Sequence, residues 1–367
     1  MPPRVAAPAF FRLVALSLLA SWGAAACGRG GERGTAGGAW GGPPAGERTT
    51  PPAPRPHPAA ARGTATSPDD SALVVRVLDV GQGDATLVTD GGSRVLVDGG
   101  ADPRRLGVLL DSLGLRGETI DVVVVTHAHL DHYRGLQTLF DSRRATRVRF
   151  VFENRDVSPN VTLAELRDSI AARVRRGETV WRDTDDPCGD GRPVCTVTLR
   201  GGARLHVLRP DPRARTPNER STPVKLVAAD STRFAMWLAG DAERGAIGWI
   251  DRGADYDRRP GMDVHVLKAG HHGSCDGTTS RLLDLVSPQW VVVSLGADND
   301  YGHVHAQTKR LLRARGIPWY RTDLNGTITI RAPGADGAPY AIEPQRGAPS
   351  LDGPTDRRSG QAECRRM

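Results

Sequence analysis

Asp121-Val-Val-Val-Val-Thr-His-Ala-His-Leu-Asp-His132 is the stretch on which the rest of this chain depends. Its four consecutive valines predict a strand that is buried on both faces. The strand leads directly into four side chains able to bind a metal, namely His127, His129, Asp131 and His132. Imidazole and carboxylate groups without thiolates are ligands for Zn²⁺, Mn²⁺ or Fe²⁺. The stretch therefore predicts a metal site at the end of a central strand.

Two later strands are expected to end in loops with the same chemistry. The apolar segment 233–238 leads into Gly240-Asp241, and the segment 263–267 leads into Lys268-Ala-Gly-His-His-Gly-Ser274. Loops at one edge of packed sheets can meet to build a site. Asp241 is then the natural bridging carboxylate, and His271 or His272 the last ligand. Two metals held in this way activate water and stabilise the oxyanion of a phosphodiester or acyl transition state.

The pattern of elements predicts an α/β fold. A hairpin-rich part begins at Leu73, and strands then alternate with helices in one unit. Strands are expected at 73–80, 85–89, 94–98, 122–125, 148–152, 195–199, 204–208, 223–229, 233–238, 263–267 and 290–294, and near Trp319 and Ile328. Helices are expected at 104–113, 135–140, 162–176, 278–285 and 306–315.

Thr126-His-Ala-His-Leu-Asp-His132 resembles the signature of metallo-β-lactamase-fold hydrolases. Asp98, in Leu-Val-Asp-Gly-Gly, is similar to the family's aspartate that orients the histidine loop by hydrogen bonds, and Gly240-Asp241 to its bridging motif. The resemblance implies a four-layer αβ/βα sandwich, a single domain over residues 71–333, that binds one or two divalent ions, Zn²⁺ or Mn²⁺.

Four further motifs narrow the resemblance. The segments 78–85, 267–274, 299–303 and 320–323 are similar to the C-terminal hydrolase domain of ComEC-type competence (DNA-uptake) proteins, over roughly residues 72–333. This implies a metal-dependent phosphodiesterase or nuclease that uses a metal-activated water, with DNA or another phosphodiester as partner. The alternatives are a hydrolase of another ester (phosphocholine-type, a cell-wall polymer or a β-lactam) and a non-catalytic surface binding module with a degenerate metal site.

One departure from the family concerns its third histidine, which usually lies between the histidine loop and the bridging aspartate. His206 is the only histidine in that interval, and it lies in mid-strand, where we expect packing. The His127/His129 metal is therefore left a ligand short. The second set, Asp131, His132, Asp241 and His272, can still be complete.

The remaining site residues are assigned by the same resemblance. We favour His272 as the ligand, because related hydrolases present theirs in a His-x-Ser arrangement, and His271 would then face the substrate. His303 is a candidate substrate contact or proton donor, with an ordinary loop histidine as the alternative. Asp131, His271 and His303 form the expected catalytic set. Asp84 either supports a ligand or merely forms a turn.

The N-terminus predicts export. Arg4 and Arg12 precede an apolar run, Leu13 to Ala26, which is too short to span a membrane comfortably, and small residues precede Cys27. Cys27 resembles the acylated cysteine of bacterial lipoproteins, although Ala24 replaces the usual leucine. We expect a signal peptide over 1–27 and a membrane-anchored lipoprotein, with a secreted or periplasmic protein as the alternative.

Composition predicts the flanking segments. Residues 28–70 hold hardly any aliphatic side chain and are expected to form a disordered tether, and residues 334–367 a disordered tail. Because an exported chain meets an oxidising environment, Cys188 and Cys195 could close a small loop. The net charge of +7 suits an acidic partner, but nearly all basic residues are scattered arginines.

Overall fold

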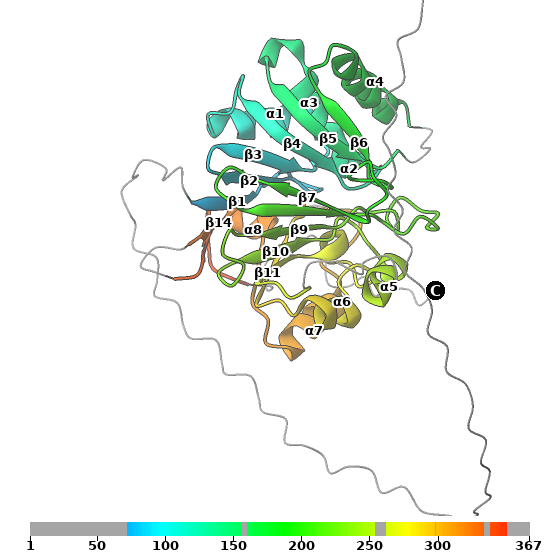
Figure 1. Cartoon of the computed structure of the whole chain (residues 1–367). Coiled ribbons are helices and arrows are strands. Elements are labelled where there is room, and N and C mark those ends of the chain that lie inside the picture. The colour runs from blue at the N-terminus through cyan, green and yellow to red at the C-terminus, as the bar shows by residue number, and fades with distance from the viewer. Residues whose placement is uncertain (1–71, 156–159, 254–261, 298, 334–337, 351–367) are drawn as a thin grey trace, which may run out of the picture. The chain divides into compact units, whose positions relative to one another are not determined.

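The computed structural model describes residues 72–155, 160–253, 262–297, 299–333 and 338–350. They all belong to the second of two compact units of the chain, Ala65–Met367. Two mixed sheets pack against each other and carry helices on their outer faces (Figure 1). The expected signal peptide 1–27, Cys27, the tether 28–70 and the end of the tail lie outside the described residues.

The first sheet grows from the hairpins that the sequence predicts. Gly91 and Gly92 adopt positive φ values in the tight turn between two antiparallel strands, the next three strands pair parallel, and the last two strands of the sheet pair antiparallel. The eight strands lie in the order β15-β14-β1-β2-β3-β4-β5-β6. Their bounds are β1 Leu73–Val77, β2 Thr86–Asp90, β3 Ser93–Val97, β4 Thr119–Val125, β5 Arg147–Glu153, β6 Val180–Asp183, β14 Ile328–Ala332 and β15 Ala341–Pro344.

The second sheet has seven strands in the order β13-β12-β11-β10-β9-β8-β7. Its strands β7 to β10 are antiparallel, and β10 to β13 are parallel, as expected where helices connect successive strands. Their bounds are β7 Val194–Thr198, β8 Arg204–Leu208, β9 Val224–Val227, β10 Ala235–Leu238, β11 Val266–Lys268, β12 Trp290–Val293 and β13 Trp319–Arg321.

The helices follow local sequence signals. The helix α1 begins after Asp102, whose carboxylate accepts a hydrogen bond from the Arg104 amide, and Pro103 occupies its first turn. Asn160 and Thr279 cap α4 and α6 in the same way. The helices are α1 Pro103–Ser112, α2 Leu130–Tyr133, α3 Gln137–Phe140, α4 Val161–Arg175, α5 Arg244–Arg252, α6 Ser280–Val286, α7 Ala306–Ala314 and α8 Thr322–Asn325, with short 3₁₀ turns η1 Arg134–Leu136, η2 Ser142–Arg144 and η3 Gly270–Gly273.

Three apolar layers hold this arrangement together. The middle layer contains residues of both sheets, such as Val122 and Met236, so it lies between them. One outer layer joins the first sheet to α1, α3 and α4, and includes Val123 and Leu166. The other joins the second sheet to α5, α6 and α7, and includes Trp237. The expected four-layer αβ/βα sandwich is therefore confirmed.

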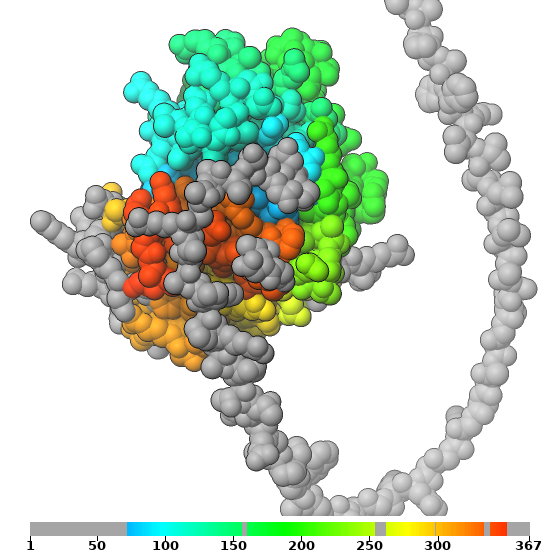
Figure 2. Space-filling view, turned by 90° about the vertical axis from the view of Figure 1, so that its left-hand side faces the viewer, coloured from blue at the N-terminus to red at the C-terminus, as the bar shows by residue number. Residues whose placement is uncertain are grey.

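Several elements differ from the sequence-based expectation. The strand β6, the helix α5 and the one-turn helices α2 and α8 were not predicted, because β6, α2 and α8 have only four residues each and α5 contains two glycines. The folded part also continues beyond residue 333, where we placed its end. Ala341–Pro344 pair with β14 as an edge strand, and this segment, coloured red, lies beside orange β14 in Figure 2. A strand of this length between glycines and prolines gives no recognisable strand pattern in the sequence.

Cys188 and Cys195 form a disulfide that closes the loop before β7. The sequence alone allowed either this disulfide or two free thiols.

Among the residues that the structure describes, no helix combines the length and the apolar character needed to cross a membrane.

Candidate metal centre

The histidine loop, Thr126 to His132, follows directly after β4. Val122 and Val124 point into the middle apolar layer, while Val123 and Val125 point into an outer layer. Burial on both faces fixes the register of this strand, so the residues that follow it have a defined position. His127 and His132 are fully buried, and the side chain of Asp131 is 21% exposed.

Asp98, just after β3, supports this loop. Its carboxylate accepts hydrogen bonds from the Thr126 amide (2.8 Å) and the Thr126 hydroxyl (2.7 Å). Asp98 Oδ2 also lies 2.8 Å from His132 Nδ1. A carboxylate accepts only, so His132 Nδ1 carries the hydrogen and Nε2 presents its lone pair. Asp98 therefore selects the tautomer of His132.

Asp241 reaches the histidine loop from the end of β10 in the second sheet. Gly240 has φ +55°, and a Cβ at this position would lie 2.9 Å from Thr126 Cβ, so glycine permits the close approach. The Asp241 amide donates to Ser221 Oγ (3.1 Å). Asp241 is buried, and its two carboxylate oxygens face different histidines.

The tandem histidines lie in η3, which follows β11. Both have left-handed backbone conformations, with φ +48° at His271 and φ +50° at His272. Such values are uncommon for residues other than glycine and concentrate at functional sites. The His271 amide donates to the Gly240 carbonyl (3.1 Å), which ties the tandem to the Asp241 loop.

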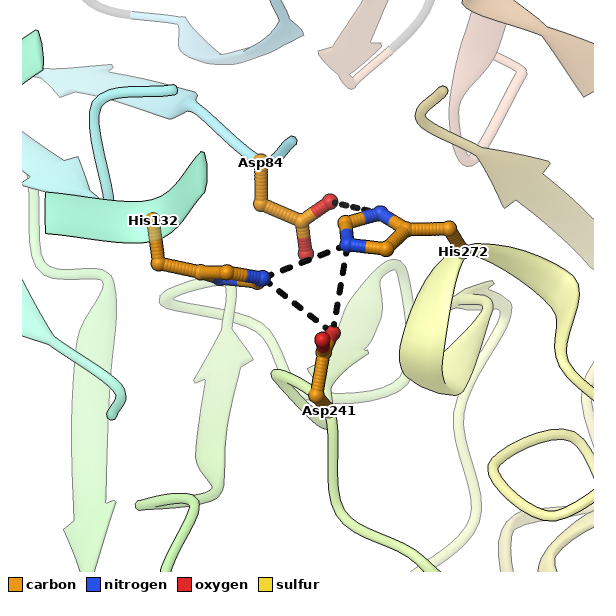
Figure 3. A group of neighbouring side chains, drawn as sticks. All are labelled: Asp84, His132, Asp241 and His272. Atoms are coloured by element: carbon orange, nitrogen blue, oxygen red, sulfur yellow. Dashed lines mark hydrogen bonds and ion pairs between the residues drawn. The ribbon is translucent and has the colours of Figure 1, made fainter. Parts of the chain in front are cut away.

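One group of donors surrounds Asp241 Oδ1. His132 Nε2 lies 3.2 Å and His272 Nε2 3.5 Å from this oxygen, and the two nitrogens are 3.2 Å apart (Figure 3). Asp131 Oδ2 lies 3.3 Å from His272 Nε2. The structure thus brings together the four residues of the expected complete set.

Asp84 also lies in this group, but on the far side of the His272 ring. Its Oδ1 is 3.1 Å from Nδ1 of His272 (Figure 3), and its Oδ2 is 2.7 Å from the Lys268 ammonium. The four residues Asp84, His132, Asp241 and His272 are close enough to share an ion, but Asp84 Oδ2 is paired with Lys268 and Oδ1 faces Nδ1 of His272 rather than Nε2. We therefore assign Asp84 to the support of His272.

A second group of donors surrounds Asp241 Oδ2. His127 Nε2 lies 3.6 Å from this oxygen and 3.1 Å from His129 Nδ1. His127, His129 and Asp241 are close enough to share one ion. Asp241 therefore occupies the position that a carboxylate bridging two ions requires.

The donor set fits a cation, because its lone pairs converge. His272 Nδ1 donates to the Ser294 carbonyl (2.9 Å), so its Nε2, like that of His132, is an acceptor. Two such nitrogens and a carboxylate oxygen directed at one another repel unless a positive charge lies between them. Asp241 Oδ1 also has no hydrogen-bond partner. Imidazole and carboxylate donors suit Zn²⁺ or Mn²⁺.

The charges around the first group favour a positive charge at this place, which either a bound cation or a proton on His132 can supply. Burial opposes protonation of His132, yet Asp241 and Asp98 outweigh it and hold the pKa of His132 well above its usual range. Burial likewise disfavours the Asp241 carboxylate, but His132 and His272 hold the pKa of Asp241 well below its usual range. By contrast, burial and the neighbouring His132 hold the pKa of His127 well below 6.5, which leaves a neutral ring suited to a metal.

The structure places His303 beside the tandem histidines. Its ring centroid lies 5.3 Å from that of His271 and 6.1 Å from that of His272. Burial, and then the two neighbouring histidines, lower the pKa of His303 to about 2. The neutral ring can donate or accept one hydrogen bond toward a substrate, but as a proton donor it would first have to be protonated against this shift.

His206 lies away from both groups. It is on β8, where Nδ1 lies 2.8 Å from the Thr196 hydroxyl of β7. Among the described residues between the histidine loop and Asp241, Ser221 contacts the centre instead, through the Asp241 amide.

Sequence reasoning missed several residues that hold the centre in place. Lys268 could have been identified from the sequence, because it is one of only three lysines and ends an apolar strand. Glu243 lies 3.2 Å from His271 Nδ1, and nothing in its local sequence indicates this. The other missed residues are Thr126, Asn218, Ser221 and Ser294.

Comparisons with known proteins agree with the fold. Residues 78–186 match the family model described as "Metallo-beta-lactamase superfamily". The chain is 27% identical over 284 residues to "ComE operon protein 3" of Bacillus subtilis, covering 70% of this chain and 33% of the relative. It is 26% identical over 264 residues to "Competence protein ComA" of Neisseria gonorrhoeae, covering 71% and 32%. The resemblance to metallo-β-lactamase-fold and ComEC-type proteins is thereby confirmed.

The chain thus spans about a third of the length of these curated relatives. Among solved structures, Igni18, a metallo hydrolase from Ignicoccus hospitalis, is similar with a TM-score of 0.43 and 15% identity, covering 70% of this chain and 98% of that chain.

Proposed function

We propose that this chain is an exported, metal-dependent phosphodiesterase that cleaves DNA. The observation that supports it most is the position of Asp241, whose two oxygens face two separate groups of imidazole donors. A centre of this kind is suited to hydrolysis of a phosphodiester. The name of one relative, "Competence protein ComA" of Neisseria gonorrhoeae, favours DNA over other phosphodiesters.

The residues that would hold the cations are those of the two groups. His127, His129 and Asp241 would hold one, and Asp131, His132, Asp241 and His272 the other. A cation bound there would supply a Lewis acid for a phosphoryl oxygen and lower the pKa of a water. Asp98 and the Ser294 carbonyl keep the Nε2 atoms of His132 and His272 directed at the centre.

Asp131 is the centre's ionised group nearest to solvent. Burial alone would raise its pKa, but His272 and His132 outweigh this and hold the pKa of Asp131 far below its usual range. We assign it a place beside the attacking water, which it would orient by accepting a hydrogen bond. His303, whose ring lies beside that of His271, would contact the phosphate.

The test is hydrolysis by the full chain loaded with Mn²⁺ or Zn²⁺. Labelled single- and double-stranded DNA and bis(p-nitrophenyl) phosphate are offered to the parent, to Asp241→Asn and to His206→Gln as the control. We expect cleavage by the parent and the control and none by Asp241→Asn. Intact DNA and intact ester under every metal condition, with metal bound, would rule out the phosphodiesterase.

A binding module with a degenerate centre is the competing function. The binding module would be supported if the parent and Asp241→Asn bound DNA equally well and neither protein hydrolysed any ester.

We also propose that the chain is anchored through Cys27 after removal of the preceding residues. The support is the charged start and the apolar run Leu13 to Ala26. Mass spectrometry of the mature N-terminus from the producing cell tests this. Acylated Cys27 is expected, and an unmodified N-terminus at another residue would contradict it.

A further inference from the structure

The second group of donors, around Asp241 Oδ2, lacks one ligand. His127, His129 and Asp241 supply three donors, whereas closed zinc sites use four and the related hydrolytic sites use three protein donors besides a shared group. The third histidine of the family has no counterpart in this centre, because His206 of β8 pairs with Thr196 of β7. Either the group binds its ion weakly, or another residue completes it.

His271 lies where the additional donor is needed. Its Nε2 is 3.7 Å from Asp241 Oδ2, the same oxygen that lies 3.6 Å from His127 Nε2. Donors around one ion, each about 2.0–2.1 Å from it, are about 3.3 Å from one another in a tetrahedral site. His271 Nε2 is thus a few tenths of an ångström beyond this distance from Asp241 Oδ2, and its ring must also move closer to His127 and His129 to complete the second group.

The backbone explains how two adjacent histidines serve two ions. In an extended strand successive side chains point to opposite faces. In η3 both residues are left-handed instead, and the two side chains approach Asp241 from two sides. His272 Nε2 lies near Oδ1, and His271 Nε2 lies near Oδ2.

The other ring nitrogen of His271 is held as that of a metal ligand usually is. Nδ1 lies 3.2 Å from Glu243 Oε1, and this oxygen also accepts a hydrogen bond from Asn218 Nδ2 (2.7 Å). A carboxylate behind an imidazole fixes its tautomer with the lone pair on Nε2. Glu243 thus lies behind His271 at ion-pair distance, although the contact lacks the hydrogen-bond geometry that Asp98 has with His132.

We propose that His271 Nε2 is the fourth protein donor of the cation subsite formed by His127, His129 and Asp241. This inference rests on the proposed metal-dependent function and changes one role: His271 binds a cation rather than the substrate alone. The chain then holds two cations without the third histidine, and Glu243 is a positioning residue for His271.

The test is the number of cations bound, measured without any substrate. The full chain is equilibrated with limiting Zn²⁺, and the bound metal is determined by mass spectrometry and by titration. We expect two equivalents in the parent and one in His271→Ala. His303→Ala is the matched control, because His303 lies next to His271 but, among the described residues, forms no ion pair with Asp241, and it should keep two equivalents.

Glu243→Gln provides a second variant that keeps the shape of the side chain. It should weaken one of the two equivalents by about 10- to 100-fold and leave the other unchanged. The visible spectrum of the Co²⁺-loaded protein should change in His271→Ala and not in His303→Ala, which reports directly on the ligands.

Two results would overturn the inference: His271→Ala that binds two equivalents with the parent's affinities, or a folded parent that binds fewer than two. A parent that binds two equivalents without cleaving DNA would overturn the proposed substrate, whereas the comparison of His271→Ala with the parent would still decide the role of His271.

Discussion

The Nε2 atoms of His132 and His272 lie 3.2 Å apart, and in the neutral rings both are acceptors. Each ring has its hydrogen on Nδ1, where Asp98 and the Ser294 carbonyl receive it. Two buried lone pairs at this distance, beside the carboxylate of Asp241, are an unfavourable arrangement without a positive charge. The fold therefore holds in place an arrangement that a cation stabilises.

Replacement of His132 by alanine should abolish one cation site. Because metal ions contribute several kcal/mol to stabilisation of the transition state, and about 4 kcal/mol corresponds to about 10³-fold in rate, we expect kcat/KM to fall by at least about 10³-fold. Hydrolysis of bis(p-nitrophenyl) phosphate and metal content measure both effects. A His132→Ala protein within tenfold of the parent would contradict the assignment, with His206→Gln as the unaffected control.

Removal of the metal should lower the melting temperature. A cation present at 100 times its Kd adds about 2.7 kcal/mol to the free energy of unfolding. In a domain of this size one kcal/mol shifts Tm by about 2–4 °C, so a chelator should lower Tm by about 5–11 °C. Calorimetry with and without chelator measures the shift. Asp241→Asn should show little of it, and an equal shift in that variant would mean that the chelated ion lies elsewhere.

Asp98→Asn should weaken the cation bound by His132. The amide keeps the shape of the carboxylate but loses its charge and no longer selects the tautomer of His132. We expect a loss of about 10- to 100-fold in metal affinity with a smaller effect on folding. Titration with Zn²⁺ in competition with a chromophoric chelator measures the affinity. Parent affinity in Asp98→Asn would show that Asp98 supports only the backbone.

Lys268→Met should destabilise the fold. Lys268 and Asp84 form a buried ion pair at 2.7 Å, and burial of Asp84 is outweighed by Lys268 and His272, which lower its pKa to about 2. Removal of one partner leaves a buried charge uncompensated, at a cost of about 3–5 kcal/mol. The double variant Lys268→Met/Asp84→Asn should lose less than the sum of the two single variants. Urea denaturation measures all four proteins, and strict additivity would mean that the two side chains are not coupled.

His206→Gln should reduce the sensitivity of the fold to acid. Burial, Arg204 and Lys225 lower the pKa of His206 from 6.5 to about 4. Between these values the unfolded chain binds a proton that the folded chain does not, so His206 removes stability as the pH falls from 6.5 to 4. Above pH 6.5 the ring is neutral in both states and has no such effect.

Because His206 is partly exposed, we expect the variant to gain roughly 1–2 kcal/mol relative to the parent at pH 4.5, compared with pH 7.5. The difference between the two proteins in urea denaturation at both pH values isolates this residue from the other histidines. A difference that does not change with pH would show that His206 titrates normally.

Most of the elements could be predicted from local sequence patterns. The valines before Thr126, the leucines of α1 with Pro103 at its start, and the hairpin glycines 91 and 92 each leave a local signal. The strand β15 does not, because its residues are intermediate in burial and its stability comes from pairing with β14. Similarly, α5 is helical because it covers the second sheet, although Gly245 and Gly248 disfavour a helix.

The types of ligand were determined by the sequence itself. A buried strand that ends in His-Ala-His-Leu-Asp-His, another that ends in Gly-Asp and a third followed by His-His together specify imidazole and carboxylate donors at strand ends. Which nitrogen or oxygen faces which partner was decided only by the tertiary structure. His132 and His272 are 140 residues apart in the chain and meet because two sheets pack on one apolar layer. The division of Asp241 between two groups depends on the left-handed backbone of His271 and His272, a conformation that the packed loops impose and that neither residue prefers by itself.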